Sequence, residues 1–353
     1  MTEPTLQKVG PPSSPAVETL HVIPEQEVGA SARRERVRAL TSLISRNGAV
    51  AVLILVMIVG TITVPSFGTA DNLRNTALAA SFLAIIAAGM TFVIISGGID
   101  LSVGSVYAFA VILSADMSKY GSVAAVLVPI AACVALGLVQ GVVIAKLGLP
   151  PFIVTLAGLT GVRGLVFLIT NEGNDHPSVP GQQFFETLGT GSLLTIGNPV
   201  WITLVVFAIG WWILNRTAFG QAVQAVGGND TAAGLMGLPV SRVKITVYAI
   251  SGLTVGIAGV LSTALSGGGQ EARVGNAYEL SAIAAVVIGG TLLAGGVGSI
   301  VGTLAGIALL YVIQNLIVQG FNLNSYVQQV VSGFFLLVVV VLQALLSRRA
   351  EAT

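Results

Sequence analysis

Residues 122–145 read SVAAVLVPIAACVALGLVQGVVIA, and this run contains no charged side chain. A helix needs about 20 apolar residues to cross the hydrocarbon core of a bilayer, so the run predicts a membrane-spanning helix. The whole chain is 54% hydrophobic and only 9% charged, whereas soluble domains carry about 25% charged residues. Barrel strands alternate over about ten residues, unlike the unbroken apolar runs found here. We therefore predict an all-α integral membrane protein.

Ten apolar runs are candidate spans, which predicts about ten transmembrane helices. They cover residues 48–64, 76–96, 101–115, 122–145, 150–170, 199–215, 245–266, 280–294, 297–319 and 325–346. The third and eighth are short and adjoin glycine-rich segments at 97–104 and 289–298, which we expect to dip into the protein. With the residues around them, the segments read VIISGGIDLSVGS (93–105) and VVIGGTLLAGGVGS (286–299), a weak similarity that hints at an internal repeat.

Basic residues indicate the orientation of these spans. With the N-terminus in the cytosol, the cytosolic segments hold Arg33, Arg34, Arg36, Arg38, Arg46, Lys146, Arg216, Arg242, Lys244, Arg348 and Arg349. The outer segments then hold Arg74, Lys119 and Arg273. This excess on the cytosolic side obeys the positive-inside rule, and the opposite orientation would invert it. We therefore expect both termini to be cytosolic.

The polar ends of the chain suggest three parts. Residues 1–42 are rich in Pro, Glu and Ser and predict a disordered cytosolic tail. Residues 43–347 would form the membrane domain, and 348–353 a short cytosolic tail. A polar leader of more than forty residues precedes the first apolar run, so we expect that run to be a retained span and not a signal peptide. Cys133, the single cysteine, lies inside an apolar run and is expected to pack there.

Several kinds of chemistry are excluded by the sequence. None of the four lysines follows Gly or precedes Ser or Thr, so no P-loop for ATP is present. The two histidines and one cysteine make no recognisable zinc site, and we expect no cofactor or metal. A net charge of +1 gives no indication of nucleic-acid binding. Few ionisable residues lie within the spans, which weakens the case for an ion-coupled carrier.

Three longer stretches carry a resemblance to a known family. They read GMTFVIISGGIDLSVGSV (89–106), QAVGGNDTAAGLMGLPVSRVKITVYAISGLTVGIAGVL (224–261) and YELSAIAAVVIGGTLLAGGVGSIVGTLAG (278–306). Together they resemble the permease subunits of bacterial ABC importers for ribose and related monosaccharides, roughly from Leu43 to Leu345. The resemblance implies a plasma (inner) membrane protein that pairs with a second permease copy, two cytosolic ATPase domains and an extracytoplasmic sugar-binding protein.

Three other functions remain open. More distant relatives of these permeases carry branched-chain amino acids or nucleosides, although the Gly-Ile-Asp-Leu-Ser run favours sugars. An ion-coupled secondary carrier would need no ATPase partner. A membrane scaffold without transport activity is disfavoured by the glycine-rich segments and the polar residues within the spans.

Residues 216–244 form a long connection whose middle predicts a short helix. Thr231 to Met236 would form that helix, capped by Asn229 or Asp230. Gly227 and Gly228 would supply a flexible turn before it, and Gly237 would help to end it. The resemblance implies that this is the coupling helix, held by the ATPase. The residues that we expect to contribute are Gly227, Gly228, Asn229, Asp230, Thr231, Ala232, Ala233 and Gly237. Related permeases tend to read Glu-Ala-Ala where this chain has Asp-Thr-Ala.

Candidate residues of the substrate pathway are polar groups at membrane depth: Asp100, Ser102, Arg163, Gln314 and Asn315. Asp100 could instead be the N-cap of the third span. Arg163 is expected to form an internal ion pair or to line the pathway, because a mid-bilayer arginine costs about 2.5–3.5 kcal/mol. Gly161 and Gly164 would let another helix approach. Gln314, Asn315 and the pair Gln328 and Gln329 could bind a sugar or join helices.

Overall fold

The computed structural model describes residues 49–321, apart from 180, 182 and 269, and five further positions at 327, 330, 333, 334 and 337. Six helices in this part are long and apolar enough to cross a membrane. They are α2 (Ala70–Ile95), α4 (Ser122–Leu147), α5 (Pro151–Ile169), α7 (Asn198–Arg216), α10 (Val240–Ser266) and α12 (Ile300–Phe321). The predicted class of a helical membrane protein is therefore confirmed, with six of the ten predicted spans present as long apolar helices.

Three further apolar helices have fewer described residues than the ~20 that a full span needs. They are Ala49–Thr63, α3 (Val103–Met117) and α11 (Tyr278–Ile288). The prediction of a helix over 280–294 is wrong at its end, because two glycines stop α11 at Ile288. Its 11 residues reach only about 16 Å, half of a bilayer core. Of the predicted span at 325–346, only residues 327, 330, 333, 334 and 337 are described.

The two long connections contain elements that the sequence analysis missed. Residues 171–198 hold α6 (Gln183–Thr190) and an antiparallel pair, β1 (Ser192–Leu193) and β2 (Ile196–Gly197). Leu194 and Thr195 at its turn both have positive φ, as a type I′ turn requires. The connection after α7 holds α8 (Ala218–Gly228), which was not predicted, and α9 (Asp230–Leu235), which is the predicted short helix. A short 3-10 helix (Ser118–Tyr120) follows α3.

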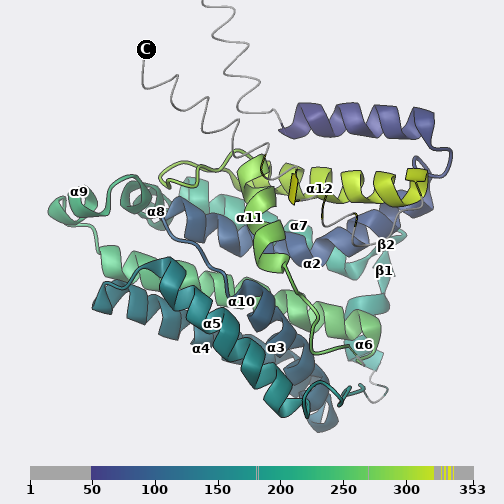
Figure 1. Ribbon diagram of the computed structural model, residues 1–353, viewed down its shortest axis with the longest axis horizontal. Helices are drawn as coiled ribbons and strands as arrows, with labels where there is room; N and C mark the ends of the chain where they lie inside the picture. The colour runs from purple at the N-terminus through teal and green to yellow at the C-terminus, as the bar shows by residue number, and fades with distance from the viewer. Residues whose placement is uncertain are drawn as a thin grey trace, which may run out of the picture. The chain divides into compact units, whose positions relative to one another are not determined.

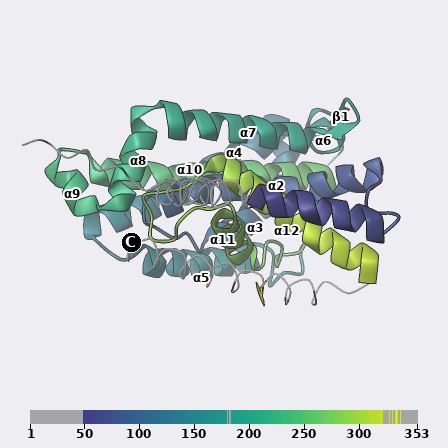
Figure 2. The same cartoon turned by 90° about the horizontal axis from the view of Figure 1, so that it is seen from above.

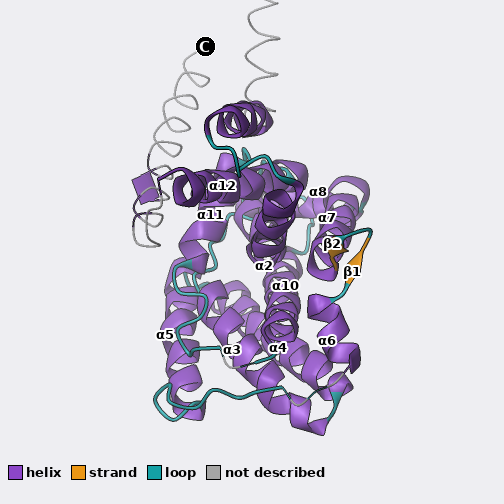
Figure 3. Ribbon diagram, turned by 90° about the vertical axis from the view of Figure 1, so that its right-hand side faces the viewer, coloured by secondary structure: helices purple, strands orange, loops and turns teal. Residues whose placement is uncertain are grey.

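Two helices form the centre of the described bundle. Every residue from Ala80 to Ile95 of α2 is buried, as expected for a helix that is apolar on all sides. The second central helix, α10, packs against α2, α3 and α4 (Figure 3). Figures 1 and 2 show α8 and α9 at one end of this bundle and α6 with the β-hairpin at the other.

Paired glycines allow α4 and α10 to cross closely. Gly137 and Gly141 of α4 face α10, and Gly252 and Gly256 of α10 face α4. A Cβ at Gly141 would lie 2.8 Å from an α10 backbone carbon, and one at Gly252 would overlap an α4 carbonyl. Small residues four apart on each helix are the usual means of close packing in a membrane. Cys133 lies in this contact and is fully buried, as expected.

The close contact between α4 and α10 predicts how glycine substitutions change thermal stability. We expect Gly252→Leu to destabilise the chain by about 1–3 kcal/mol or more, because its side chain has no space against the α4 backbone. The matched control is Gly161→Leu, since no heavy atom of the described chain lies within 4 Å of a Cβ there. Thermal unfolding of both variants in detergent should show a lower Tm only for Gly252→Leu. Equal Tm values would contradict the proposed role of the glycines.

Candidate functional site

The predicted coupling helix is present as α9, and Asn229 is its cap. Asn229 separates α8 from α9, and its side-chain oxygen accepts a hydrogen bond from the Ala232 amide at 2.8 Å. Of the two predicted caps, Asn229 and Asp230, the structure therefore has Asn229. The prediction of a flexible turn at Gly227 and Gly228 is wrong, because both residues belong to the last turn of α8.

Gly237 ends α9 in the left-handed conformation, with φ +83°. The Leu238 amide donates to the Ala233 carbonyl and the Gly237 amide to the Gly234 carbonyl, both at 3.0 Å. This is a Schellman motif, in which a residue with positive φ satisfies the last carbonyls of a helix. The predicted role of Gly237 in ending the helix is therefore confirmed.

Most of α9 is exposed. Ala233 is fully buried, whereas Thr231 and Ala232 are exposed. Leu235 and Met236 are 87% and 72% exposed, which is unusual for large apolar side chains beside a polar loop. The sequence analysis missed both residues, although two apolar side chains at the end of a predicted exposed helix were the available signal.

An ion pair fixes α9 to α10. Nζ of Lys244 lies 2.9 Å from Oδ2 of Asp230, and the Thr231 hydroxyl donates to Oδ1 at 3.3 Å. The Lys244 ammonium lowers the pKa of the Asp230 carboxyl, chiefly through the hydrogen bond from Nζ of Lys244 to Oδ2 of Asp230. The acid at position 230 therefore holds α9 against α10, and the threonine at 231 supports the acid.

Glycine backbones connect α8 to two other parts of the bundle. We call Gly97, Gly227, Gly295 and Gly296 the glycine junction. A Cβ at Gly227 would overlap the carbonyl oxygen of Ile95, and one at Gly295 would lie 2.9 Å from the Cα of Gly97. The Gly296 amide donates to the same Ile95 carbonyl at 2.8 Å. The end of α8 thus touches both glycine-rich segments directly.

The two glycine-rich segments begin in the same way. After α2, the Gly98 amide donates to the Val93 carbonyl at 3.0 Å, and Gly97 has φ +81°. After α11, the Thr291 amide donates to the Val286 carbonyl at 3.2 Å, and Gly290 has φ +89°. Both are Schellman motifs at equivalent positions of the two similar sequences. Each segment then leads to another helix, α3 or α12.

Asp100 lies in a buried polar network and is not the N-cap that the sequence predicts. Ser102 occupies the cap position of α3, and its amide donates to Oδ1 of Asp100 at 2.9 Å. The hydroxyls of Ser102 and Ser251 donate to the two carboxylate oxygens at 2.6 and 2.8 Å. Gln140 of α4 donates to the Ser102 hydroxyl at 3.0 Å. The network therefore joins the start of α3 to α4 and α10.

This network leaves no room for a sugar. Asp100 is only 3% exposed, and the cavity beside it measures about 10 Å³, close to the volume that one water needs. In this conformation Asp100 and Ser102 therefore join helices. Whether they line the pathway in another conformation stays a prediction.

Arg163 binds backbone carbonyls. Its Nη1 donates to the carbonyl oxygens of Ala272 and Val274 at 2.9 and 3.0 Å, both in the connection between α10 and α11. The expected ion pair is not formed at contact distance among the described residues, where no acidic oxygen lies within 4.0 Å of Arg163. Glu279 of α11 is the acidic residue that interacts with Arg163 electrostatically over a longer distance. The expected close helix is absent too, since no described heavy atom lies within 4 Å of a Cβ at Gly161 or Gly164. Arg163 thus holds a loop in place.

Asn315 joins α12 to the start of α2. The side chains of Asn315 and Asn72 exchange two hydrogen bonds of 2.9 and 3.0 Å, and Gln319 donates to Asn72 at 3.1 Å. Gln314 is half-buried on the same helix, and Gln328 and Gln329 lie outside the described residues. No hydrogen bond in the described part of the chain joins Asp100 or Ser102 to Arg163 or Asn315.

The six candidate membrane spans define a helical, multi-pass membrane protein. Comparison with known proteins identifies its family. Residues 72–340 match the family described as branched-chain amino acid transport system / permease component. The chain belongs to this permease family, whose members are transport subunits and not catalytic enzymes.

Individual relatives refine this picture. The chain is 38% identical to the ribose import permease protein RbsC of Haemophilus influenzae over 304 residues, 84% of this chain and 92% of the relative. It is 36% identical to the L-arabinose ABC transporter permease protein AraH of Azospirillum brasilense over 330 residues, 93% of this chain and 95% of the relative. The resemblance to permeases of the ribose type is therefore confirmed.

The glycine junction predicts a difference between two adjacent glycines. We expect Gly227→Ala to separate α8 from Ile95 and to break the bond between the Ile95 carbonyl and the Gly296 amide. Gly228→Ala is the control, because a Cβ there meets no heavy atom within 4 Å. Hydrogen–deuterium exchange of residues 289–299 should become faster in Gly227→Ala and stay unchanged in Gly228→Ala. Unchanged exchange in both variants would refute the junction.

Proposed function

We propose that this chain is the membrane-spanning permease subunit of an ATP-driven importer that moves a monosaccharide across the bacterial inner membrane. The observation that carries the proposal is α9, a capped and largely exposed helix that directly follows α8, the helix whose last turn lies in the glycine junction. The ribose and L-arabinose permeases among the relatives support a sugar as cargo. The family description names branched-chain amino acids, and this second cargo is less favoured because the relatives compared above carry sugars.

The proposed topology has ten spans with both termini in the cytosol. Residues 1–42 and 348–353 would be cytosolic tails, and 43–347 the membrane domain with the coupling connection at 216–244. Contacts between predicted segments support it. Gly97, Gly227 and Gly295 are all assigned to the cytosolic side and meet. Ser178 and Gly268 are both assigned to the outer side and form a β-bridge.

The chain would act with three kinds of partner. A second permease copy would complete the pathway, cytosolic ABC ATPase domains would hydrolyse ATP, and an extracytoplasmic binding protein would deliver the sugar. The chain itself needs no cofactor for this role. Leu235 and Met236 are suited to a groove on the ATPase, because burying exposed apolar side chains stabilises a contact by about 25 cal/mol per Å².

The mechanism follows from the contacts of α8 and α9. Movement of the ATPase domains would displace α9, and the Asp230–Lys244 pair would carry that displacement to α10. The close contact at Gly227 would carry it to the α2–α3 and α11–α12 connections. Because packed helices have discrete arrangements, the displacement would shift the bundle between two states and not deform it gradually.

The proposed function is tested by reconstituting the full complex in proteoliposomes. The chain, its ATPase and its binding protein should take up radiolabelled ribose or arabinose when ATP is inside. Leucine is the comparison substrate for the alternative cargo. Uptake of leucine without uptake of any monosaccharide would overturn the proposal.

The orientation is tested with one cysteine. In a Cys133→Ala background, Ala232→Cys should react with an impermeant thiol reagent in inside-out vesicles and not in intact cells. Leu194→Cys, in the turn of the β-hairpin, is the matched control and should react in intact cells. The reverse pattern would invert the proposed topology.

The docking role of α9 gives a separate prediction. Leu235→Glu should reduce co-purification of the ATPase and sugar uptake at least tenfold, because a carboxylate replaces an apolar contact. Leu194→Glu is the control, since Leu194 is 76% exposed. The hairpin of β1 and β2 that carries it lies at the end of the bundle opposite α9 (Figure 1). Normal co-purification and uptake with Leu235→Glu would exclude this residue from the ATPase contact.

A further inference from the structure

A cavity of about 460 Å³ lies among α2, α3, α10, α11 and α12. None of the predicted pathway residues lines it. Its polar and aromatic lining consists of Asn75, Tyr107, Ser262, Gln270, Tyr278 and Tyr311, a set that we call the tyrosine pocket. The volume falls in the ~300–1,000 Å³ range of small-molecule sites.

The three tyrosines come from three different helices and contact one another. The rings of Tyr107 and Tyr278 stack with centroids 5.1 Å apart and an interplanar angle of 30°. The hydroxyl groups of Tyr278 and Tyr311 interact. Tyr107 is only 1% exposed, whereas Tyr278 and Tyr311 are half-buried. The pocket therefore has a supported aromatic wall with phenolic hydroxyls along it.

Amide groups complement this wall. Nε2 of Gln270 donates to the Ser262 and Ser266 hydroxyls, both at 2.9 Å, which orients the amide. No hydrogen bond among the described residues uses its Oε1 or the side chain of Asn75. An amide offers both donors and an acceptor, as a ligand rich in hydroxyl groups requires.

The absence of charged side chains among the described lining residues favours a neutral sugar over a free amino acid as the ligand of this pocket. Among the described residues that line the tyrosine pocket, none is acidic or basic. A free amino acid carries a carboxylate and an ammonium, and both would lose water here without an ionic partner. A neutral sugar avoids this cost, because its hydroxyls can pair with amides and phenols while its C–H face packs on an aromatic ring.

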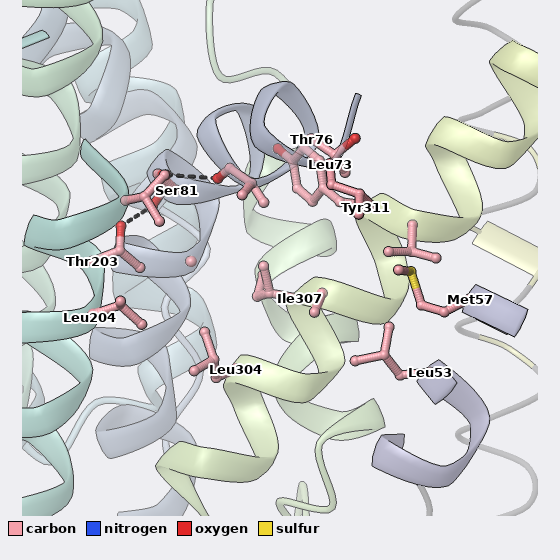
Figure 4. Close-up of a pocket in the computed structure, with 16 residues that line it drawn as sticks. Leu53, Met57, Leu73, Thr76, Ser81, Thr203, Leu204, Leu304, Ile307 and Tyr311 are labelled. Atoms are coloured by element: carbon pink, nitrogen blue, oxygen red, sulfur yellow. Dashed lines mark hydrogen bonds between the residues drawn. The ribbon is translucent and has the colours of Figure 1, made fainter. Parts of the chain in front are cut away.

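The largely apolar pocket in Figure 4 provides a contrast. It has a volume of about 310 Å³ and lies among the helix Ala49–Thr63, α2, α7 and α12. Its Ser81 and Thr203 hydroxyls already donate to backbone carbonyls, at 2.8 Å each. That pocket offers a sugar few free hydrogen-bonding groups.

From these features we propose that the tyrosine pocket is a binding station for a neutral monosaccharide on its way through the permease, an inference that rests on the proposed function. Its walls include α2 and α3, joined by one glycine-rich segment, and α11 and α12, joined by the other. Arg163 is a positioning residue for this site, because it holds the α10–α11 connection that carries Gln270. Because both glycine-rich segments contact Gly227 in the glycine junction, they link the station to α8.

Uptake by variants of the complete complex in proteoliposomes tests the station. Tyr278→Ala should reduce sugar uptake at least tenfold, whereas Tyr278→Phe should keep more than half of it. Asn75→Ala, at an exposed side chain, should reduce uptake several-fold without altering the fold. Stimulation of ATP hydrolysis by the loaded binding protein should persist in all three. Leu53→Ala, in the pocket of Figure 4, is the control and should leave uptake unchanged.

Thiol protection gives an independent measurement. In the complex with Cys133→Ala, Ser262→Cys should react with a small thiol reagent, and saturating sugar should slow the reaction at least fivefold. Thr76→Cys, in the other pocket, should show no protection. If the unaltered complex transports no monosaccharide, the proposed function fails and the station with it. If it transports sugar while Tyr278→Ala and Asn75→Ala are normal and Ser262→Cys is unprotected, the station alone is overturned.

Discussion

Direct contact between glycine backbones at Gly97, Gly227 and Gly295 is the constraint on which the rest of the structure depends. A side chain at Gly227 would overlap the Ile95 carbonyl, which also accepts the Gly296 amide. With no side chains between them, the backbones of the three segments pack directly against one another. Backbone contacts of this kind transmit displacement better than contacts between long, flexible side chains. The short helix α9 therefore connects to the membrane helices through a stiff joint.

The same constraint explains how the pocket and the coupling helix belong to one machine. The two glycine-rich segments leave the junction and lead into α3 and α12, and the helices before them are α2 and α11. These four helices form most of the wall of the tyrosine pocket. A displacement at α8 therefore reaches the pocket through the chain itself, without a long series of side-chain contacts.

The sequence predicts the features that depend on neighbouring residues, and it does not predict contacts between residues far apart in the chain. Apolar length predicts the six long helices, and the Asn229 cap and Gly237 stop follow from local residue preferences. The end of α11 was missed because Leu292 and Leu293 continue the apolar run after the glycines that stop the helix. Arg163 donates to backbone carbonyls, and because every residue has a carbonyl, the sequence does not indicate which ones it binds. The three tyrosines lie too far apart in sequence for any local pattern to bring them together.

The two glycine-rich connections are held with unequal strength, and this matters for a two-state bundle. The first is fixed by Asp100, whose buried carboxylate accepts three hydrogen bonds and whose loss would leave buried hydroxyls without their acceptor. That network ties α3 to α4 and α10. The second, residues 289–299, is largely exposed, with Val297 among its exposed side chains. A displacement arriving at the junction would therefore meet least resistance on the side of α11 and α12, which carry Tyr278 and Tyr311. The wall of the pocket that moves would be the one whose tyrosines are only half-buried, while Tyr107 stays fixed on α3.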